Sequence, residues 1–345
     1  MLAHRSHRLW PAAIPALQLT GAVVALLAAS STACACSSCG CNLSPDWVAS
    51  NGNTGAGVKL DLRYDYLNQS QLRQGTHRIS PQAASQVVND GEPQEVEQYT
   101  RNHYFTAALD YSPQPDWGVN LQLPYVSRSH STLGNASDGV TAGADGGQFH
   151  SHTSSLGDVK VLGRYLGLTP ARNLAVIAGL KLATGSHTKT GTSTDPGAPG
   201  AVDIDRGLQP GTGTTDAIVG LTYSGSSAPS WDYFVQGLFQ TALHSRDDYR
   251  PGNGLNLNAG WRYLGLPSVQ PQVQINVRHA GRDSGANADV PSSGGTLLYV
   301  SPGLAVPLGN QTSVYGYVQL PLYQDVKGVQ LVPRFTASIG LRHAF

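Results

Sequence analysis

Charged side chains are scarce in this sequence, and neither sign prevails. They make up 13% of the 345 residues, with 22 basic and 22 acidic side chains. Proteins that bind nucleic acid generally carry a basic excess, so the composition argues against such a partner. The chain is instead rich in glycine, with 40 residues, and its mean hydropathy is slightly negative at -0.20. This balance fits a surface that is divided between lipid and water.

Long hydrophobic runs are also missing, except near the N-terminus. Arg5 and Arg8 precede an interrupted apolar run over residues 12–29, and Ala33-Cys34-Ala35 follows with the small residues of a cleavage site. These features in this order are typical of a secretory signal peptide. No later segment reaches the roughly 18 apolar residues of a membrane-spanning helix. We therefore predict an export signal over residues 1–35, in preference to a membrane anchor.

Cysteine occurs only at positions 34, 36, 39 and 41, so no disulfide can cross-link the rest of the chain. Cleavage after residue 35 would leave Cys36, Cys39 and Cys41 in a segment over residues 36–55, which we expect on the periplasmic side. Three thiolates at this spacing could hold a soft metal ion such as copper(I) or zinc. A zinc site usually has four ligands, however, and no histidine lies nearby. Two alternatives stay open: a disulfide with one thiol left over, or a lipid attached to Cys34 or Cys36. We expect no other cofactor.

Helical periodicity is absent after the signal, and an alternation of apolar and polar residues takes its place. In residues 58–66, for example, Val58, Leu60 and Leu62 alternate with Lys59, Asp61 and Arg63. Period-two alternation is typical of half-buried β-strands. Similar patterns predict about twelve strands, over residues 58–66, 104–111, 119–123, 158–165, 174–182, 216–223, 233–243, 255–263, 272–278, 295–306, 313–322 and 334–345.

The segments between the predicted strands alternate strictly in length. The short ones, which carry Pro, Gly, Ser or Asn, cover residues 112–116, 167–173, 224–230, 264–268 and 307–311. The long ones cover residues 68–97, 127–155, 185–214, 245–252 and 282–294. Transmembrane barrels show this pattern because their periplasmic turns are short and their outer loops are long. A secreted soluble β-protein, which strand number alone would allow, has no reason to show it.

The polar faces of the strands support the same fold class. Lys59, Asp61, Arg63 and Asp65 share one face of a single strand, and unpaired charges are too costly for a dry protein core. They fit a wet or ion-paired lumen. A sheet in a bilayer must also close, since no water satisfies an open edge. We therefore predict an all-β antiparallel transmembrane β-barrel over residues 56–345, surrounded by the lipid of the bacterial outer membrane.

Aromatic residues near the strand ends fit the girdles that membrane proteins place at the interfaces. These residues are Trp117, Tyr125, Tyr165, Tyr223, Trp231, Trp261 and Tyr263. The chain also ends in a strand whose last residue is Phe345. That ending resembles the C-terminal aromatic signal that outer-membrane proteins present to the barrel-assembly machinery, which we expect as a partner.

A set of charged residues is expected to line the lumen. The set consists of Lys59, Asp61, Arg63, Asp65, Asp158, Lys160, Arg164, Lys181, Arg262, Arg278, Arg334 and Arg342. With about twelve strands the bore would be narrow, and basic groups along it could steer an anion. The same charges could instead pair with one another and serve the structure alone.

Histidines in the long segments are weaker candidates. His130, His150, His152 and His187 are expected on one side of the barrel, and imidazoles bind zinc, copper and nickel. We favour solvated loop histidines over a metal site. No Gly-x-Ser-x-Gly motif occurs, and no arrangement of Ser, His and Asp predicts catalysis, so we expect no enzyme.

Three segments resemble a known family. They are Ser155-Leu-Gly-Asp-Val-Lys-Val-Leu-Gly-Arg-Tyr165, Gly179-Leu-Lys-Leu-Ala-Thr-Gly185 and Leu208-Gln-Pro-Gly-Thr-Gly-Thr-Thr-Asp216. Together they are similar to the outer-membrane β-barrel family linked to the meta-pathway of phenol degradation, although Ala183 stands where that family usually has Pro. The resemblance implies a transporter-like barrel for hydrophobic small molecules. The cysteine segment is not part of the family pattern.

Two functions follow as expectations. The first is a passive outer-membrane channel or binding barrel for a small, hydrophobic or aromatic solute. The alternative is a metal-handling or partner-docking component that uses the cysteine segment.

Overall fold

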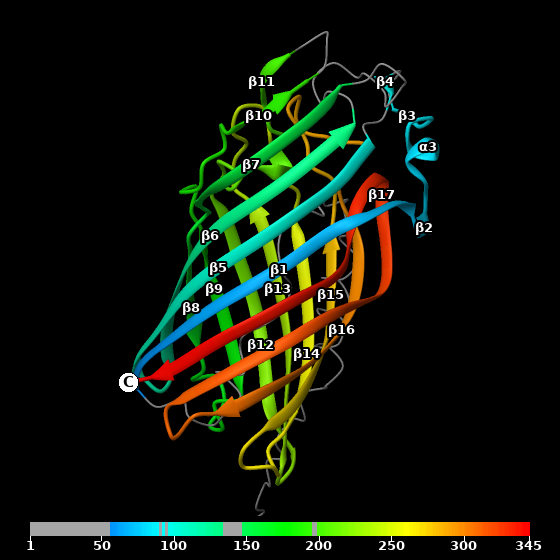
Figure 1. Ribbon diagram of the computed structural model, residues 1–345. Helices are drawn as coiled ribbons and strands as arrows, with labels where there is room; N and C mark the ends of the chain where they lie inside the picture. The colour runs from blue at the N-terminus through cyan, green and yellow to red at the C-terminus, as the bar shows by residue number, and fades with distance from the viewer. Residues whose placement is uncertain (1–55, 90–91, 94–95, 134–146, 195–198) are drawn as a thin grey trace, which may run out of the picture. The chain divides into compact units, whose positions relative to one another are not determined.

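The computed structural model describes residues 56–89, 92–93, 96–133, 147–194 and 199–345. Eleven antiparallel strands form a ring that closes where β6 pairs with β8. Figure 1 shows them side by side, with β1 in blue next to β17 in red. In ring order they are β1 (Gly57–Gly75), β5 (Val96–Gln114), β6 (Trp117–Leu133), β8 (Lys160–Tyr165), β9 (Leu174–Lys181), β12 (Asp216–Ala228), β13 (Trp231–Ala242), β14 (Gly254–Tyr263), β15 (Gln270–Ala280), β16 (Gly295–Pro307) and β17 (Thr312–Ala344). The closed antiparallel barrel expected from the sequence is thereby confirmed.

The longest strand, β17, folds back on itself. Its residues 313–326 pair with β16, whereas residues 326–344 pair with β1. A backbone hydrogen bond from the Ala344 N–H to the Gln311 carbonyl at 2.9 Å joins its two ends. Gly328 adopts a φ of 63° at the reversal, a conformation that suits glycine. The two arms of β17 correspond to the predicted strands 313–322 and 334–345, which the sequence treated as separate.

The connections alternate in length as expected. Few residues separate β5 from β6, β8 from β9, β12 from β13, β14 from β15, and β16 from β17. Smaller elements fill the opposite end, namely β2 (His77–Arg78), α3 (Pro81–Ala84), β3 (Val88–Asn89), β4 (Glu92–Pro93), β7 (Gln148–Leu156), β10 (Thr190–Ser193), β11 (Gly200–Asp203) and the 3-10 helix η1 (Arg206–Leu208). No helix in the described part of the chain has the length and apolar character needed to cross a bilayer.

Several segments that we expected to be long loops are extended strands. β6 continues to Leu133, and β7 pairs with it from Tyr125↔Leu156 to Leu133↔Gln148. β1 likewise continues to Gly75. Hydrophobic alternation marks only the part of a strand that faces lipid. Beyond that part the strands are rich in Ser, Thr, Gln and His, so the sequence pattern does not reveal them.

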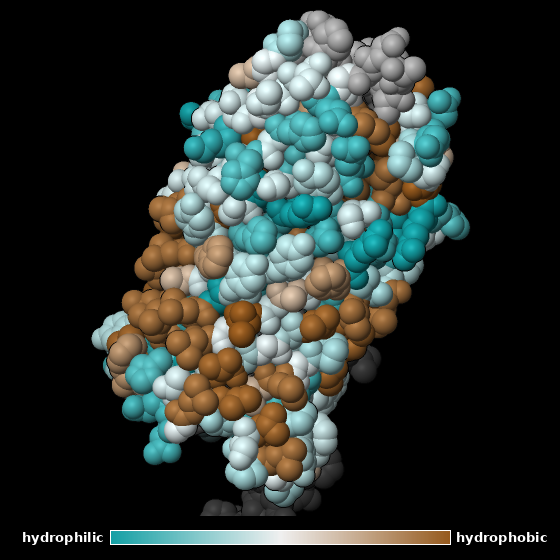
Figure 2. Space-filling view, viewed as in Figure 1, coloured by the Kyte–Doolittle hydropathy of each residue, from teal (hydrophilic) through white to brown (hydrophobic). Residues whose placement is uncertain are grey.

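The outer wall of the barrel carries apolar side chains and rings. Leu62, Phe105 and Leu109 are exposed on it, on β1 and β5. The expected aromatic girdle forms in pairs near the short turns, with ring centroids 4.7 Å apart for Trp117 and Tyr165 and 5.0 Å apart for Trp231 and Tyr263. In Figure 2, brown hydrophobic residues gather toward the lower part of the visible face, and teal residues dominate the loop end. An apolar wall around a polar interior is the arrangement that a membrane barrel requires.

Candidate functional site: the lumen

A cavity of about 390 Å³ lies inside the barrel. Its lining begins near the short turns, at Lys59 and Arg164, and reaches Arg206 and Tyr249 at the loop end. The cavity therefore extends along the lumen from one end of the barrel toward the other. All of the predicted lumen residues except Arg262 and Arg334 line it.

The two exceptions have physical causes. Arg262 is 4% exposed and forms an ion pair of 3.0 Å with Asp232, in a packed part of the interior. Arg334 is exposed and lies at a register shift, where Asn68 pairs with Phe335 but the next residue of β1 pairs with Pro333. An extra residue in a strand reverses the alternation of side chains. Arg262 therefore lies in the packed interior and Arg334 on the exposed side, so neither residue lines this cavity.

Each aspartate of the cavity forms an ion pair. Asp61 pairs with Arg342 at 3.0 Å, and Asp65 with Arg63 at 2.8 Å. Asp110 pairs with Arg164 at 3.1 Å, while Asp158 and Asp216 both lie 3.0 Å from Lys181. The lining contains more basic than acidic residues, so it is basic overall. The nine basic residues are Lys59, Arg63, Arg128, Lys160, Arg164, Lys181, Arg206, Arg278 and Arg342.

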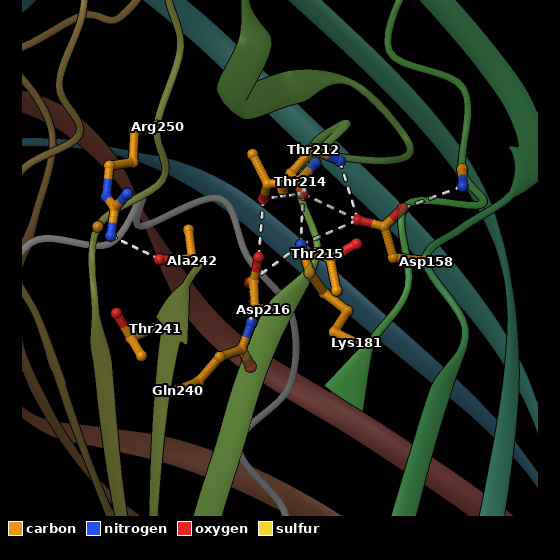
Figure 3. A network of polar contacts seen from close by, with 12 residues as sticks. Asp158, Lys181, Thr212, Thr214, Thr215, Asp216, Gln240, Thr241, Ala242 and Arg250 are labelled. Carbon is orange, nitrogen blue, oxygen red and sulfur yellow. Dashed lines mark hydrogen bonds and ion pairs between the residues drawn. The ribbon is translucent and has the colours of Figure 1, made fainter. Parts of the chain in front are cut away.

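Asp158 is the centre of a buried polar network that Figure 3 shows. Its Oδ1 accepts from the backbone N–H of Gly185 at 3.0 Å, and its Oδ2 accepts from the backbone N–H of Thr212 at 2.9 Å. The Thr212 hydroxyl donates to the same Oδ2 at 3.0 Å. Lys181 donates to Asp158 and to the Thr212 hydroxyl. A carboxylate with this many donors is held in one position.

The three motifs that suggested a family meet at this network. Gly157 and Asp158 belong to the first motif, Gly185 to the second, and Gly211 and Thr212 to the third. A Cβ on Gly211 would lie 2.5 Å from the backbone of Gly185, so the two segments can cross only as glycines. The sequence shows glycines at the predicted strand ends. Because Gly157, Gly185 and Gly211 are far apart in the chain, the sequence does not indicate that they lie together in one site.

The network holds the inward loop, defined here as residues 182–194 and 199–215, against the lumen. The tail of this loop, from Arg206 to Thr212, lines the cavity. Arg128 of β6 donates toward the carbonyls of Gly207 and Gln209, at 3.4 Å each. The tail of the loop therefore occupies part of the lumen and narrows it.

Arg206 ties the inward loop to the next outer loop, residues 243–253. Its guanidinium donates to Asp247 at 3.2 Å and lies 5.1 Å from the centre of the Tyr249 ring. The hydrogen bond from Arg206 lowers the pKa of the Asp247 carboxyl. His187 also lies 3.4 Å from Asp247. These contacts fix the loop end of the cavity from two sides.

The opposite side of the lumen is filled. Phe234, Ala305, Tyr315 and Tyr317 form a buried apolar cluster on β13, β16 and β17. Beside it, Asn276 donates to Asn258 at 2.9 Å and accepts from Ser301 at 2.7 Å, and other amides extend this ladder across neighbouring strands. The expected narrow bore arises because one side of the interior is packed. Alternation placed these residues inside, but nothing in the sequence separated the filled side from the open one.

An apolar strip also lines the cavity. Leu162, Ile177, Ile218 and Leu238 lie on the adjacent strands β8, β9, β12 and β13. Gly179 pairs with both Leu162 and Ile218, and it leaves room for Leu162, because a Cβ at this position would lie 2.9 Å from the Leu162 side chain. The open side of the lumen is therefore partly apolar and partly basic.

The metal candidates remain separate. His130 is buried on β6 and lies 2.7 Å from the Thr100 hydroxyl, so it is not a loop residue. His150 and His152 are exposed on β7 and contact Gln148 and Ser129. Within the described ranges, no group of three metal-ligating side chains occurs. Cys36, Cys39 and Cys41 lie outside the described residues.

Solved structures show what the fold is similar to. The COG4313 outer membrane channel from Pseudomonas putida F1 matches with a TM-score of 0.57 and 13% identity, over 84% of this chain and 96% of that chain. That likeness, together with the apolar wall and the polar lumen, decides the class. The protein has the fold of an outer-membrane β-barrel. Two further matches have TM-scores below 0.5.

One of these is the Ralstonia pickettii toluene transporter TbuX, at a TM-score of 0.47 and 12% identity, covering 85% of this chain and 91% of that chain. The other is a Pseudomonas aeruginosa FadL homologue, at 0.43 and 9% identity, covering 83% and 90%. No family model matches the barrel's sequence, and no curated protein matches it either.

Proposed function

We propose that the protein is a passive channel of the outer membrane, through which a small solute crosses the lumen without catalysis. The observation that carries this proposal is the cavity that extends from Lys59 and Arg164 to the outer loops. A structural barrel needs no such space, since an interior this narrow can be filled by side chains. Side chains fill one side of this lumen, so the space on the other side does not arise from a general lack of large inward-facing residues.

The resemblance to the phenol meta-pathway family adds a solute class to the proposal, a hydrophobic or aromatic small molecule. The apolar strip of Leu162, Ile177, Ile218 and Leu238 supports that class, since such a surface favours contact with an apolar body. Phe345 is 70% exposed at the C-terminus, which suits its proposed role as a signal to the assembly machinery.

The test is single-channel recording in planar bilayers, with the full chain exported and purified from outer membranes. We expect discrete conductance steps. Ala108 lines the cavity, whereas its neighbour Ala107 lies on the outer face of β5. Ala108→Trp should therefore lower the conductance, and Ala107→Trp should leave it unchanged. A folded barrel without conductance steps would overturn the proposal.

The same recording also tests the role of the cysteine segment. A variant with Cys36, Cys39 and Cys41 changed to Ser should conduct like the unmodified protein, because the proposed path uses only the lumen. A metal-dependent loss of conductance in that variant would favour the alternative, in which the segment handles metal or docks a partner.

A further inference from the structure

The lining of the cavity has more basic than acidic residues, and this excess of positive charge determines which solutes the cavity favours. Its lining contains nine basic and five acidic residues. The surplus is positive and lies inside a barrel whose wall faces lipid. In a narrow space with low-dielectric walls, such a surplus concentrates anions and repels cations.

Three basic residues of the lining come from separate parts of the barrel wall. Lys160 on β8, Arg63 on β1 and Arg278 on β15 all line the cavity, and none of these strands neighbours another in the ring. Basic groups from three separate strands thus face the same cavity, and one of them, Arg63, also pairs with Asp65. An anion in this space would be attracted by the positive excess of the lining.

The apolar strip begins next to Lys160, one of these three basic residues. Lys160 and Leu162 both line the cavity from β8, two residues apart, which is about 7 Å along a strand. Ile218 of β12 extends the strip beyond Leu162 across Gly179. A ligand with one negative group and a compact apolar body could reach Lys160 and the strip at the same time.

We propose that the lumen selects small organic anions, with a carboxylate near Lys160, Arg63 and Arg278 and an apolar or aromatic body against Leu162 and Ile218. The inference rests on the proposed channel function and names its solute class. A neutral aromatic molecule gains only the apolar contact, and a small inorganic anion gains only the charge. A preference for ligands that have both a negative charge and an apolar body would therefore distinguish this lumen from a general polar pore.

The first experiment measures the reversal potential across a potassium chloride gradient. Unmodified channels should prefer chloride. The double variant Lys160→Gln with Arg278→Gln should lose most of this preference, and Lys160→Arg should keep it. The matched control is Arg101→Gln with Arg334→Gln, which removes two exposed charges of barrel strands outside the cavity and should leave the reversal potential unchanged.

The second experiment measures how benzoate, acetate and benzamide block the chloride current. Benzoate should block at the lowest concentration, because it alone has both the charge and the ring. Ile218→Ser should raise the half-blocking concentration of benzoate at least about threefold without changing the reversal potential. Val219→Ser, on the outer face of the same strand, is the control and should change neither value.

The outcomes separate the two proposals. A folded barrel that never conducts would overturn the channel function itself. A conducting barrel with no preference for chloride, or one that prefers potassium, would overturn the organic-anion inference and leave the channel function standing. Equal block by benzoate and acetate would also overturn the inference, since the apolar strip would then contribute nothing.

Discussion

The carboxylate of Asp158 accepts a hydrogen bond from the backbone N–H of Gly185 at 3.0 Å, and this contact joins the start of β8 to the inward loop. The same carboxylate receives Lys181 and Thr212. Asp158→Ala should therefore release the inward loop and leave Lys181 with one aspartate. Breaking a buried pair costs about 3–5 kcal/mol. We expect earlier thermal unfolding, faster proteolysis within residues 186–213 and a noisier open-channel current.

The control for this variant is Asp232→Ala. It breaks the equally buried pair with Arg262 but lies away from the inward loop. It should lower stability to a similar extent while proteolysis within residues 186–213 stays at the unmodified rate. If both variants accelerate that proteolysis equally, the Asp158 network does not hold the loop.

The crossing of two glycines makes a second prediction. A Cβ on Gly211 would lie 2.5 Å from the backbone of Gly185, where no flexible side chain can move aside. Gly211→Ala should thus displace the inward loop and cost about 1–3 kcal/mol, which thermal unfolding followed by gel mobility would record. Gly254→Ala is the control, because a Cβ there meets no heavy atom within 4 Å. Equal unfolding temperatures for the two variants would contradict the tight crossing.

Alternation predicted which residues of β1 face the lumen, because the period of two is a property of any strand. Lys59, Asp61, Arg63 and Asp65 all line the cavity. The rule failed at Arg334, where one extra residue in β17 shifts the register. A bulge depends on pairing with another strand, so the residues of a single strand do not reveal it.

Contacts between distant segments could not be predicted from the sequence either, because they too depend on which strands pair. The motif containing Asp158 and the motif containing Thr212 are far apart in the chain, and each resembles simple strand punctuation. Only closure of the barrel brings them together. Likewise, Tyr315 and Asn276 alternate like lumen residues, but they pack against other strands and fill the interior instead of lining a cavity.

That filled side gives a third prediction. Asn276 is completely buried, donates to Asn258 and Gln274, and accepts from Ser301. Asn276→Ala leaves these partners unsatisfied and should cost about 1–3 kcal/mol, seen as earlier thermal unfolding. The conductance of folded channels should not change, because Asn276 does not line the cavity. Asn310→Ala, in an exposed turn, should leave the unfolding temperature unchanged. A changed conductance in Asn276→Ala would mean that the ladder shapes the path.

Two carboxyl groups from different loops make the outer end of the barrel sensitive to pH. Desolvation by the surrounding loops raises the pKa of Asp205, in the inward loop, to about 6 although the residue keeps contact with solvent, and the charge of Asp289, in the loop after β15, adds to this rise. Desolvation by neighbouring loop residues also raises the pKa of Asp289, which likewise keeps contact with solvent. The folded loops therefore bind protons more tightly than the unfolded chain does. Stability from this source is fully present below the ordinary value of 3.8 and is lost as the pH rises through about 6.

Amide hydrogen exchange, corrected for the intrinsic effect of pH, measures this dependence. Peptides from the inward loop should be better protected at pH 5 than at pH 7.5, because ionised Asp205 and Asp289 repel each other at the higher value. Asp205→Asn should reduce the difference, since an amide has no charge to lose. Asp203→Asn, on the exposed strand β11 of the same loop, should keep it. Protection that rises with pH in the unmodified protein would contradict the assignment, because it would require carboxyl groups with lowered pKa values in the folded loops.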